Sequence, residues 1–590
     1  RFAGGVSRAL LGAWMLLASP AFADDEPAAP PREDGAADGD GRAECRDCTS
    51  AIATDGGAAA DGDTPPAVEE PSAPPREELE RRGATIRAIT IVVDNVFDPS
   101  KPEENKRLYR WANKVHIRTH ESVIDDMLLF DVGDKFDGRL LDESARALRA
   151  RGFLADAALQ PRAYDEATNT VEVEARVRDS WTLAPDLKFS RSGGKNEFAI
   201  GISDSNLFGT GKGLTAKYTS DIDRDEALLG YDDNNVFGSR VRLNVTAANA
   251  SDGHRRVLAA ERPFFSFDTR WSIGGGVSDT ERVDSMYDLG EVVDEFRHEH
   301  RSLTVQGGLS EGLVNRRALR WLFGVTHEED LFLATPAKPL PLLLPPDREL
   351  VYPWVGLQIV EDDYREMSEL NDMGRTEDVS LGLNLLLSLG VAKQSFGSDR
   401  DATLLRASAQ MGWEPGGPGR LLLFNGGGWT RDESDGLKNT VVYAGARYYQ
   451  RNFENKLFSV SFEALDSNDI DPENQVLLGG DNGLRGYPIR YQAGEGRAIL
   501  NVEERFYTDW YPWRLFRVGY AAFFDAGRVW GRDPRATTPL GMLYDVGMGL
   551  RLSSPRASGR NVVHIDLAFP LNGDPSIDNV QLVIETKGSF

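Results

Sequence analysis

The feature that most constrains the fold is an alternation of apolar and polar residues that begins after Trp181 and continues to Phe590. Successive side chains of a β-strand point to opposite faces, so each alternating segment has one apolar and one polar face. The clearest segments carry apolar residues at Leu381, Leu383, Leu385, Leu387 and Leu389, at Phe458, Val460 and Phe462, and at Val241, Leu243 and Val245. Strands of this kind close into barrels whose apolar face meets lipid and whose polar face lines the lumen. Residues 181–590 are therefore predicted to form an all-β transmembrane β-barrel of antiparallel strands.

The length of this region sets the expected number of strands. At roughly 25 residues for each strand with its loop, residues 181–590 give about 16 strands. A weak repeat near the start supports hairpins, because the sequence DSNLFG at 204–209 recurs as DNNVFG at 233–238.

The first 84 residues predict export followed by a linker. Arg1 and Arg8 precede an apolar run at 9–18, and Ala21-Phe22-Ala23 fits a cleavage site, so residues 1–23 read as a secretory signal peptide. Residues 24–84 are acidic and rich in Ala and Pro, and they contain too few large apolar residues to offset the entropy of ordering. We predict a disordered linker, with its Cys45 and Cys48 in a local disulfide rather than a redox or zinc half-site.

Residues 85–180 predict one small α+β domain. A strand around Ile89 precedes two helices, for which Thr119 and Asp137 are candidate N-caps and Gly152 a candidate C′ residue. Residues 157–162 and 170–178 then predict a hairpin whose second strand alternates regularly. That second strand is the expected edge for binding an extended peptide.

Motifs for chemistry are scarce. The net charge of −26 argues against nucleic acid as a partner. His298-Glu299-His300 is a possible metal half-site, but no third ligand is evident, and we interpret it as a charged strand end. No hydrolase, zinc-protease or nucleotide-binding motif occurs in a fitting context, so we expect no enzyme activity, no cofactor and no metal.

One glycine-rich stretch, residues 479–488 (GGDNGLRGYP), predicts a shaped loop with a single arginine, Arg485. Buried arginine needs an acidic partner, and the two following strands offer Glu503 and Asp525. Apolar residues alternate at Val518, Tyr520, Ala522 and Phe524, so Asp525 is expected to point into the lumen as the first partner, with Glu503 second.

This stretch resembles the inward-folded loop of the BamA/TamA outer-membrane insertase superfamily, whose barrel is also called the bacterial surface antigen domain. The resemblance rests on Gly483, Leu484, Arg485, Gly486 and Tyr487, and it implies that Asp525 and Glu503 anchor the loop. Residues 85–180 resemble a POTRA domain, through the order of elements, Gly133-Asp134-Lys135-Phe136 and the turn at 152–154. The last strand resembles the family's terminal barrel signal through Leu582, Ile584 and Phe590, although Gly588 departs from it.

The resemblance implies an outer-membrane assembly or translocation factor of a Gram-negative bacterium, with its POTRA domain in the periplasm. Unfolded client proteins would bind the POTRA edge strand and then be inserted or translocated through the barrel. The lipid bilayer and accessory periplasmic proteins are the other implied partners. Two alternatives stay open: a two-partner-secretion transporter, and a surface antigen or passive pore that moves no client.

Overall fold

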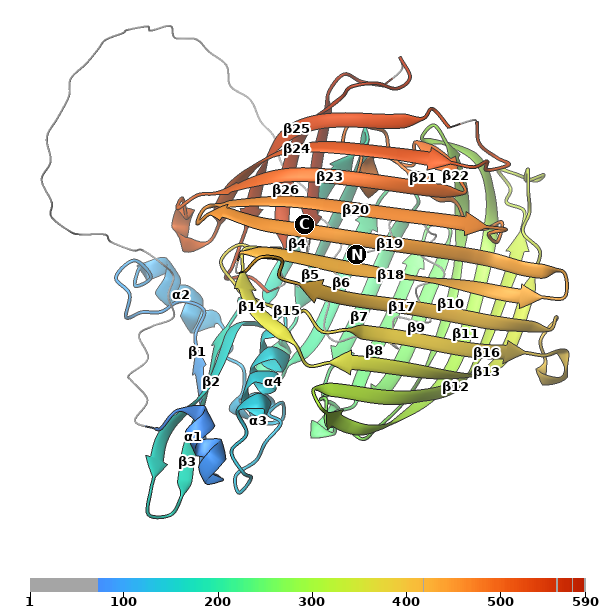
Figure 1. Ribbon diagram of the computed structural model, residues 1–590. Coiled ribbons are helices and arrows are strands. Elements are labelled where there is room, and N and C mark those ends of the chain that lie inside the picture. Colours follow the sequence, from blue (N-terminus) through green and yellow to red (C-terminus); the bar gives the residue numbers. More distant parts are fainter. Residues whose placement is uncertain (1–72, 418, 538, 559–560, 576, 588–590) are drawn as a thin grey trace, which may run out of the picture.

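The computed structural model describes residues 73–590 apart from 418, 538, 559–560, 576 and 588–590 (Figure 1). The predicted signal peptide, most of the predicted linker, Cys45, Cys48, Gly588 and Phe590 lie outside the described residues.

Twenty antiparallel strands close into one barrel, and hydrogen bonds join each strand to the next along the chain. The strands are β4 (Leu183–Ser192), β5 (Lys195–Asp204), β6 (Lys212–Ser220), β7 (Asp225–Asp233), β8 (Arg242–Ala250), β9 (Gly253–Arg262), β10 (Trp271–Asp288), β11 (Glu291–Val314), β12 (Arg317–Leu333), β13 (Arg348–Glu361), β16 (Asn384–Ala392), β17 (Ala402–Trp413), β18 (Arg420–Glu433), β19 (Gly436–Phe453), β20 (Lys456–Asn468), β23 (Gly496–Tyr507), β24 (Arg517–Trp530), β25 (Met542–Ser553), β26 (Val562–Pro570) and β27 (Gln581–Lys587). The predicted barrel class is confirmed, but the count of about 16 strands is wrong. Six strands fit between Leu183 and Arg262, because their turns are short and the average spacing is smaller than assumed.

The alternation of the sequence corresponds to two chemically different faces. On β12, the outward side chains of Trp321, Phe323 and Val325 are each about half exposed, whereas inward Leu322 and Thr326 are buried. This outward apolar surface suits lipid. Among the described residues, no helix has both the length and the apolar character needed to cross a membrane.

A closed barrel of this kind should resist detergent at low temperature. We expect the protein to fractionate with outer membranes and to migrate differently on gels before and after heating, since heating opens the barrel's hydrogen-bonded ladder. Recovery in the soluble periplasm, with identical migration in both samples, would contradict a membrane barrel.

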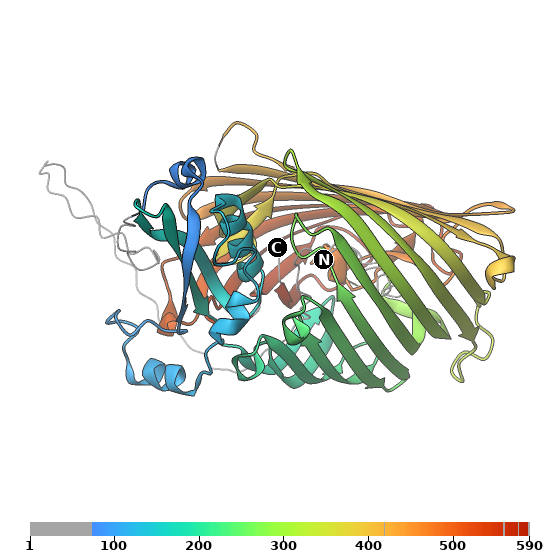
Figure 2. The same ribbon diagram turned by 90° about the horizontal axis from the view of Figure 1, so that it is seen from below.

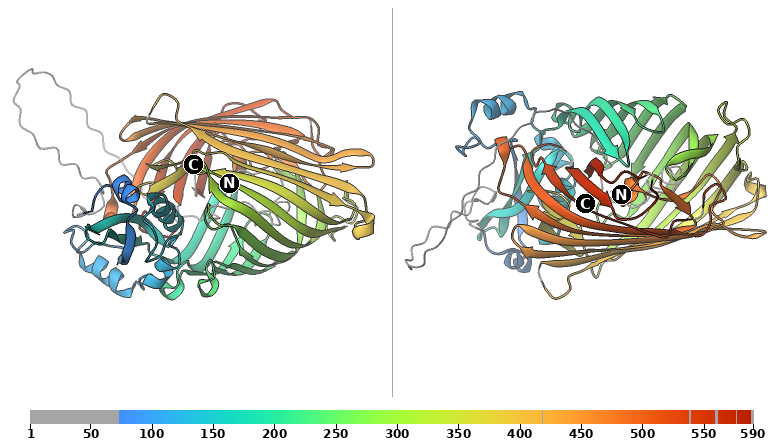
Figure 3. Two further views of the ribbon diagram at one scale, coloured as in Figure 1. Left: turned by 60° about the horizontal axis from the view of Figure 1, so that its bottom comes forward. Right: turned by 90° about the horizontal axis from the view of Figure 1, so that it is seen from above.

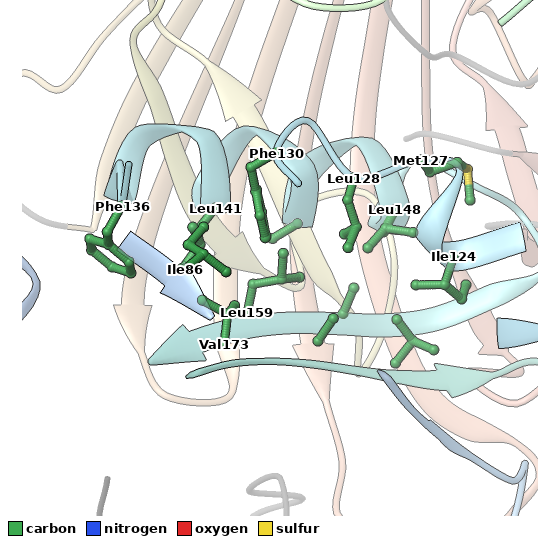
Figure 4. Close-up of a cluster of buried hydrophobic side chains, with 14 of the residues drawn as sticks. Ile86, Ile124, Met127, Leu128, Phe130, Phe136, Leu141, Leu148, Leu159 and Val173 are labelled. Atoms are coloured by element: carbon green, nitrogen blue, oxygen red, sulfur yellow. The ribbon is translucent and has the colours of Figure 1, made fainter. Parts of the chain in front are cut away.

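The N-terminal domain contains three strands and four helices before the barrel begins. Its elements are α1 (Arg76–Arg82), β1 (Thr85–Asp94), α2 (Arg107–Val115), α3 (Glu121–Asp125), α4 (Gly138–Arg149), β2 (Leu154–Asp165) and β3 (Thr170–Asp179). The sheet order is β1-β3-β2, with β1 parallel and β2 antiparallel to β3. Helix α4 buries Leu141 and Leu148 against the sheet, in one hydrophobic cluster with Val173 of β3 (Figure 4).

The sheet order corrects the expected binding edge. Strand β3 pairs on both sides and is central, so residues 170–178 cannot accept an added strand. Alternation reports which face of a strand is buried, and it carries no information about which strand lies at an edge. The edge strand of the hairpin is β2, which includes Pro161, a residue that edge strands tolerate.

Among the local expectations, one holds and three change. Asp137 caps α4 by accepting a hydrogen bond from the Arg139 N–H, as predicted. Thr119 does not cap α3; its hydroxyl donates to Asp179, and α3 follows His120. Helix α4 ends at Arg149, so Gly152 is not its C′ residue. The last part of the predicted linker folds into α1, and Leu79 of that helix is fully buried in the domain core.

The N-terminal domain lies against one end of the barrel (Figures 1 and 2). Short turns at this end contact it: Asn206, between β5 and β6, donates to the Thr119 hydroxyl, and the Phe267 N–H donates to Glu143 of α4. Strands β14 (Tyr364–Ser368) and β15 (Thr376–Ser380) form a separate hairpin between β13 and β16, beside α4 (Figure 3). The connections that include residues 468–496 lie at the opposite end.

Candidate functional site

The connection from β20 to β23 folds back into the barrel as an inward loop, residues 468–496. Strands β21 (Val476–Leu478) and β22 (Gln492–Gly494) pair at its base. Leu484 and Tyr487 near its tip are fully buried, in a cluster that includes Ile499 and Val529 of the barrel wall. The apolar residues of the loop therefore replace water inside the lumen.

Arg485 is held by acids from three strands of the barrel wall. Its Nε and Nη2 donate to the two carboxylate oxygens of Asp525 on β24, at 2.7 and 2.8 Å. Its Nη1 donates to Glu503 on β23 at 2.9 Å and to Asp566 on β26 at 3.2 Å. The guanidinium also lies over the Phe523 ring, 3.3 Å from the centroid. Bidentate pairing with a carboxylate fixes the orientation of the guanidinium as well as its charge.

Two further arginines balance these acids. Arg551 on β25 donates to Glu503 at 3.0 Å and to Asp566, and Arg505 on β23 donates to the second oxygen of Glu503 at 2.9 Å. Three arginines thus face three buried carboxylates. Sequence reasoning named Asp525 and Glu503 but missed Asp566. The alternation of β26 could have indicated it. Leu567 and Phe569 are the outward residues of this strand, so Asp566, the residue before Leu567, points inward.

Two glycines let the loop approach the barrel wall. Gly483 has a φ of +116°, which disfavours a side chain, and its carbonyl accepts a hydrogen bond from Asn501 at 2.7 Å. A Cβ on Gly486 would lie 2.6 Å from the Cβ of Asp545. Tyr487 reaches across to β25, where its hydroxyl lies 2.8 Å from the Tyr544 carbonyl oxygen.

The β14–β15 hairpin enters the lumen from the other end. Its turn places Leu370 and Met373 in a buried cluster with Tyr507 and Val562 of the barrel wall. Asp372 accepts a hydrogen bond from Ser553 at 2.8 Å. Side chains therefore fill the lumen from both ends.

This hairpin also connects the N-terminal domain to the inward loop. Arg149 of α4 donates to both oxygens of Asp378, at 2.8 and 2.6 Å, and to Glu366 at 2.7 Å. Burial disfavours the charged form of Arg149, but Asp378 and Glu366 outweigh it and raise the pKa of the guanidinium above its ordinary value. At the hairpin turn, Arg505 donates to the Leu370 carbonyl at 2.8 Å. One chain of contacts thus runs from α4 through Arg505 and Glu503 to Arg485.

The part of the chain that builds this site also has a recognisable sequence. Residues 439–587, from β19 to the end of β27, match the family model described as the Omp85 superfamily domain. This C-terminal part of the chain is similar to an Omp85 domain. Its boundaries include Arg485 and all three of the carboxylates that hold it, together with Arg505 and Arg551.

Comparison of whole structures gives only distant resemblances, to BamA and CdiB proteins and to the FrpB iron transporter from Neisseria meningitidis. BamA from Haemophilus ducreyi lacking POTRA domains 1–3 has 12% identity and a TM-score of 0.36, over 86% of this chain and 84% of that chain. CdiB from Acinetobacter baumannii has 11% identity and a TM-score of 0.41, over 86% and 73%. CdiB from Escherichia coli has 11% identity and a TM-score of 0.35, over 90% and 92%. No curated protein matches the sequence.

The Omp85 match ends at the junction where the last strand of the barrel meets the first. Among the described residues, β27 pairs with β4 through one registered pair, Ile584 with Arg191, whereas β26 and β27 share seven pairs and β4 and β5 share ten. Leu582 is exposed and Ile584 is buried on β27. Antiparallel strands gain stability from each ladder bond and side-chain pair, so the described part of this seam offers fewer pairs to break than either neighbouring junction. The closed antiparallel barrel and the match to the Omp85 superfamily domain indicate an outer-membrane protein of a Gram-negative bacterium.

Proposed function

We propose that this protein inserts client proteins into the outer membrane through the seam between β27 and β4. In this proposal the N-terminal domain is a POTRA domain on the periplasmic side, and it delivers extended client segments to the barrel. The acids around Arg485 serve to fix the inward loop. The reaction needs no cofactor, since the client's own strand pairing drives it.

The observation that carries the proposal is the contrast between the seam and the lumen. A client strand can replace the one pair that the described residues of the seam share, by pairing with the edge of β27 or of β4. Passage through the lumen, as in two-partner secretion or a passive pore, would require both the inward loop and the β14–β15 hairpin to leave it. A lateral route, between β27 and β4, therefore breaks fewer contacts than a route through the lumen.

The inward loop contacts both sides of this seam. Arg485 binds Asp566 on β26, next to β27. On the other side, Gly193 in the β4–β5 turn lies so close that a Cβ there would be 2.1 Å from the Ile489 amide nitrogen. We therefore assign the loop a role in holding the two edges in register between rounds of insertion.

A disulfide across the seam tests the lateral route. In a background with Cys45 and Cys48 changed to serine, Ile584→Cys with Arg191→Cys should cross-link, because paired residues of antiparallel strands lie about 4.5–5.5 Å apart at Cα. Oxidation is expected to stop client assembly in proteoliposomes, and a reductant should restore it. The matched control is Leu567→Cys with Leu582→Cys, which links β26 to β27, strands that already share seven registered pairs.

The control pair should leave assembly unchanged in both redox states. If the oxidised seam variant assembles clients at the wild-type rate, clients do not leave through this junction, and a lumen route would then be favoured.

The client-binding edge is tested separately with a photo-cross-linking amino acid. Placed at Ala158, an exposed residue of edge strand β2, it should capture unfolded outer-membrane clients. The same probe at Val132, which is exposed in the loop before α4, is the control. Equal capture at both positions would argue against strand addition at β2.

A further inference from the structure

Beyond the inward loop, a second cluster of polar side chains lies on the lumen side of β10, β11 and β12. These long strands extend past the apolar band on the side away from the N-terminal domain. There their outward residues are charged: Arg301 pairs with Glu329 at 3.3 Å and with Asp279 at 3.4 Å. At the same level, inward His298 and Asp330 are buried, and His300 is largely buried.

The two histidines converge on one carboxylate oxygen. His298 Nε2 lies 3.0 Å, and His300 Nδ1 2.7 Å, from the same Oδ1 of Asp330. The ligand atoms that the three residues offer all lie within 4.8 Å of one another. Zn²⁺ binds nitrogen and oxygen at about 2.0–2.2 Å in tetrahedral geometry, which places its ligand atoms roughly 3.3 Å apart. Both nitrogen–oxygen distances are shorter than this spacing by about 0.3–0.6 Å, so the carboxylate oxygen lies at the right scale of distance from both rings.

Surrounding groups orient these side chains as the outer partners of a metal site do. Asp284 lies 2.8 Å from the other ring nitrogen of His298, which is the usual carboxylate–histidine arrangement behind a metal ligand. Arg348 donates to the second oxygen of Asp330 at 2.7 Å and leaves Oδ1 to the histidines. His300 Nε2 is buried and has no hydrogen-bond partner among the described residues.

The local charge also tolerates a cation. Arg282 is paired with Asp284, Arg348 with Asp330, Asp471 and Glu473, and Arg431 with Asp471. These three arginines meet four carboxylates, so the cluster has an excess of negative charge when its histidines are neutral.

We infer that His298, His300 and Asp330 bind a divalent transition-metal ion of the Zn²⁺ type. The fourth position is open to water, as in sites with three protein ligands. The ion would join β11 to β12, and through Arg348 and Glu473, which are 2.8 Å apart, it would secure the base of the inward loop. The sequence pattern alone gave only two ligands, because Asp330 lies on the neighbouring strand.

Metal binding to the whole barrel tests this inference. The protein should carry an affinity tag without histidine, and Cys45 and Cys48 should be serine so that neither binds metal. After chelation and dialysis, wild type is expected to take up about one Zn²⁺ per chain. A titration with Co²⁺ should give the visible absorption of tetrahedral Co²⁺. His300→Ala is expected to weaken binding at least about tenfold, and Asp284→Asn about 10–100-fold.

The matched control is His254→Ala, which removes a histidine that also lies beside two acids, Asp279 at 3.1 Å and Glu281 at 3.5 Å. This variant should bind like wild type. Heat-dependent gel migration shows which variants have folded barrels. If wild type takes up no more Zn²⁺ than His300→Ala, or if His254→Ala loses the ion instead, the inference is wrong. The Co²⁺ spectrum of wild type decides the question even if a variant fails to fold.

Discussion

Arg485→Ala is expected to release the inward loop and abolish client assembly, while the barrel itself still forms. The change removes the main partner of Asp525, which is fully buried, and one partner each of Glu503 and Asp566. Breaking a buried ion pair from one side costs about 3–5 kcal/mol, because an uncompensated charge stays behind. Limited proteolysis within residues 481–488, together with an assembly assay, measures both consequences.

A control and a double variant make this result specific. Arg528→Ala removes an exposed arginine from the same strand as Asp525, and it should behave like wild type. Combining Arg485→Ala with Asp525→Ala should cost less than the sum of the single changes, because the two groups share one interaction. If the costs of the two single changes simply add in the double variant, Arg485 does not anchor the loop. The same conclusion follows if the loop resists proteolysis as in wild type in every variant.

Arg149→Ala is expected to release the β14–β15 hairpin from helix α4. Its guanidinium is buried at 6% side-chain exposure and pairs with Asp378, which is 13% exposed. Glu366 is 65% exposed, so water can solvate it when Arg149 is removed. The loss of stabilising free energy is therefore expected at the lower end of the range for broken buried ion pairs, about 3 kcal/mol. Hydrogen exchange in the β14–β15 hairpin should accelerate. Ion conductance in planar bilayers should rise, because the hairpin can then leave the lumen.

The control for this variant is Arg162→Ala, which removes an ion pair to Glu174 inside the same domain. It should leave both exchange in the hairpin and conductance unchanged. Unaltered exchange and conductance in Arg149→Ala would mean that the hairpin is held by its lumen contacts alone, independently of α4.

The sequence contained enough information for the barrel and for the first contacts of Arg485. Two-residue alternation follows directly from strand geometry, and the same alternation indicated that Asp525 faces the lumen. Asp566 was missed because the acids that meet Arg485 come from strands far apart in the chain. Only the closure of the barrel and the path of the loop bring them together.

Other features could not be read from single segments. Residues 364–380 resemble two more wall strands, yet they form a hairpin that enters the lumen, because the choice between lipid and lumen depends on neighbouring strands. Likewise, the central position of β3 depends on its pairing with β1, which lies 76 residues or more before it in a parallel arrangement. The number of strands depended on turn lengths, which vary too much for an average to fix them.

If insertion is lateral, clients pass between β27 and β4 rather than through the lumen. The most direct measurement is cross-linking of a stalled client to single photo-reactive residues placed in the barrel. We predict cross-links from Arg191 and Ile584 at the seam, and none from Asn501, which faces the lumen beside Asp525. Cross-links from Asn501 but not from the two seam positions would contradict the lateral route and identify the lumen as the path.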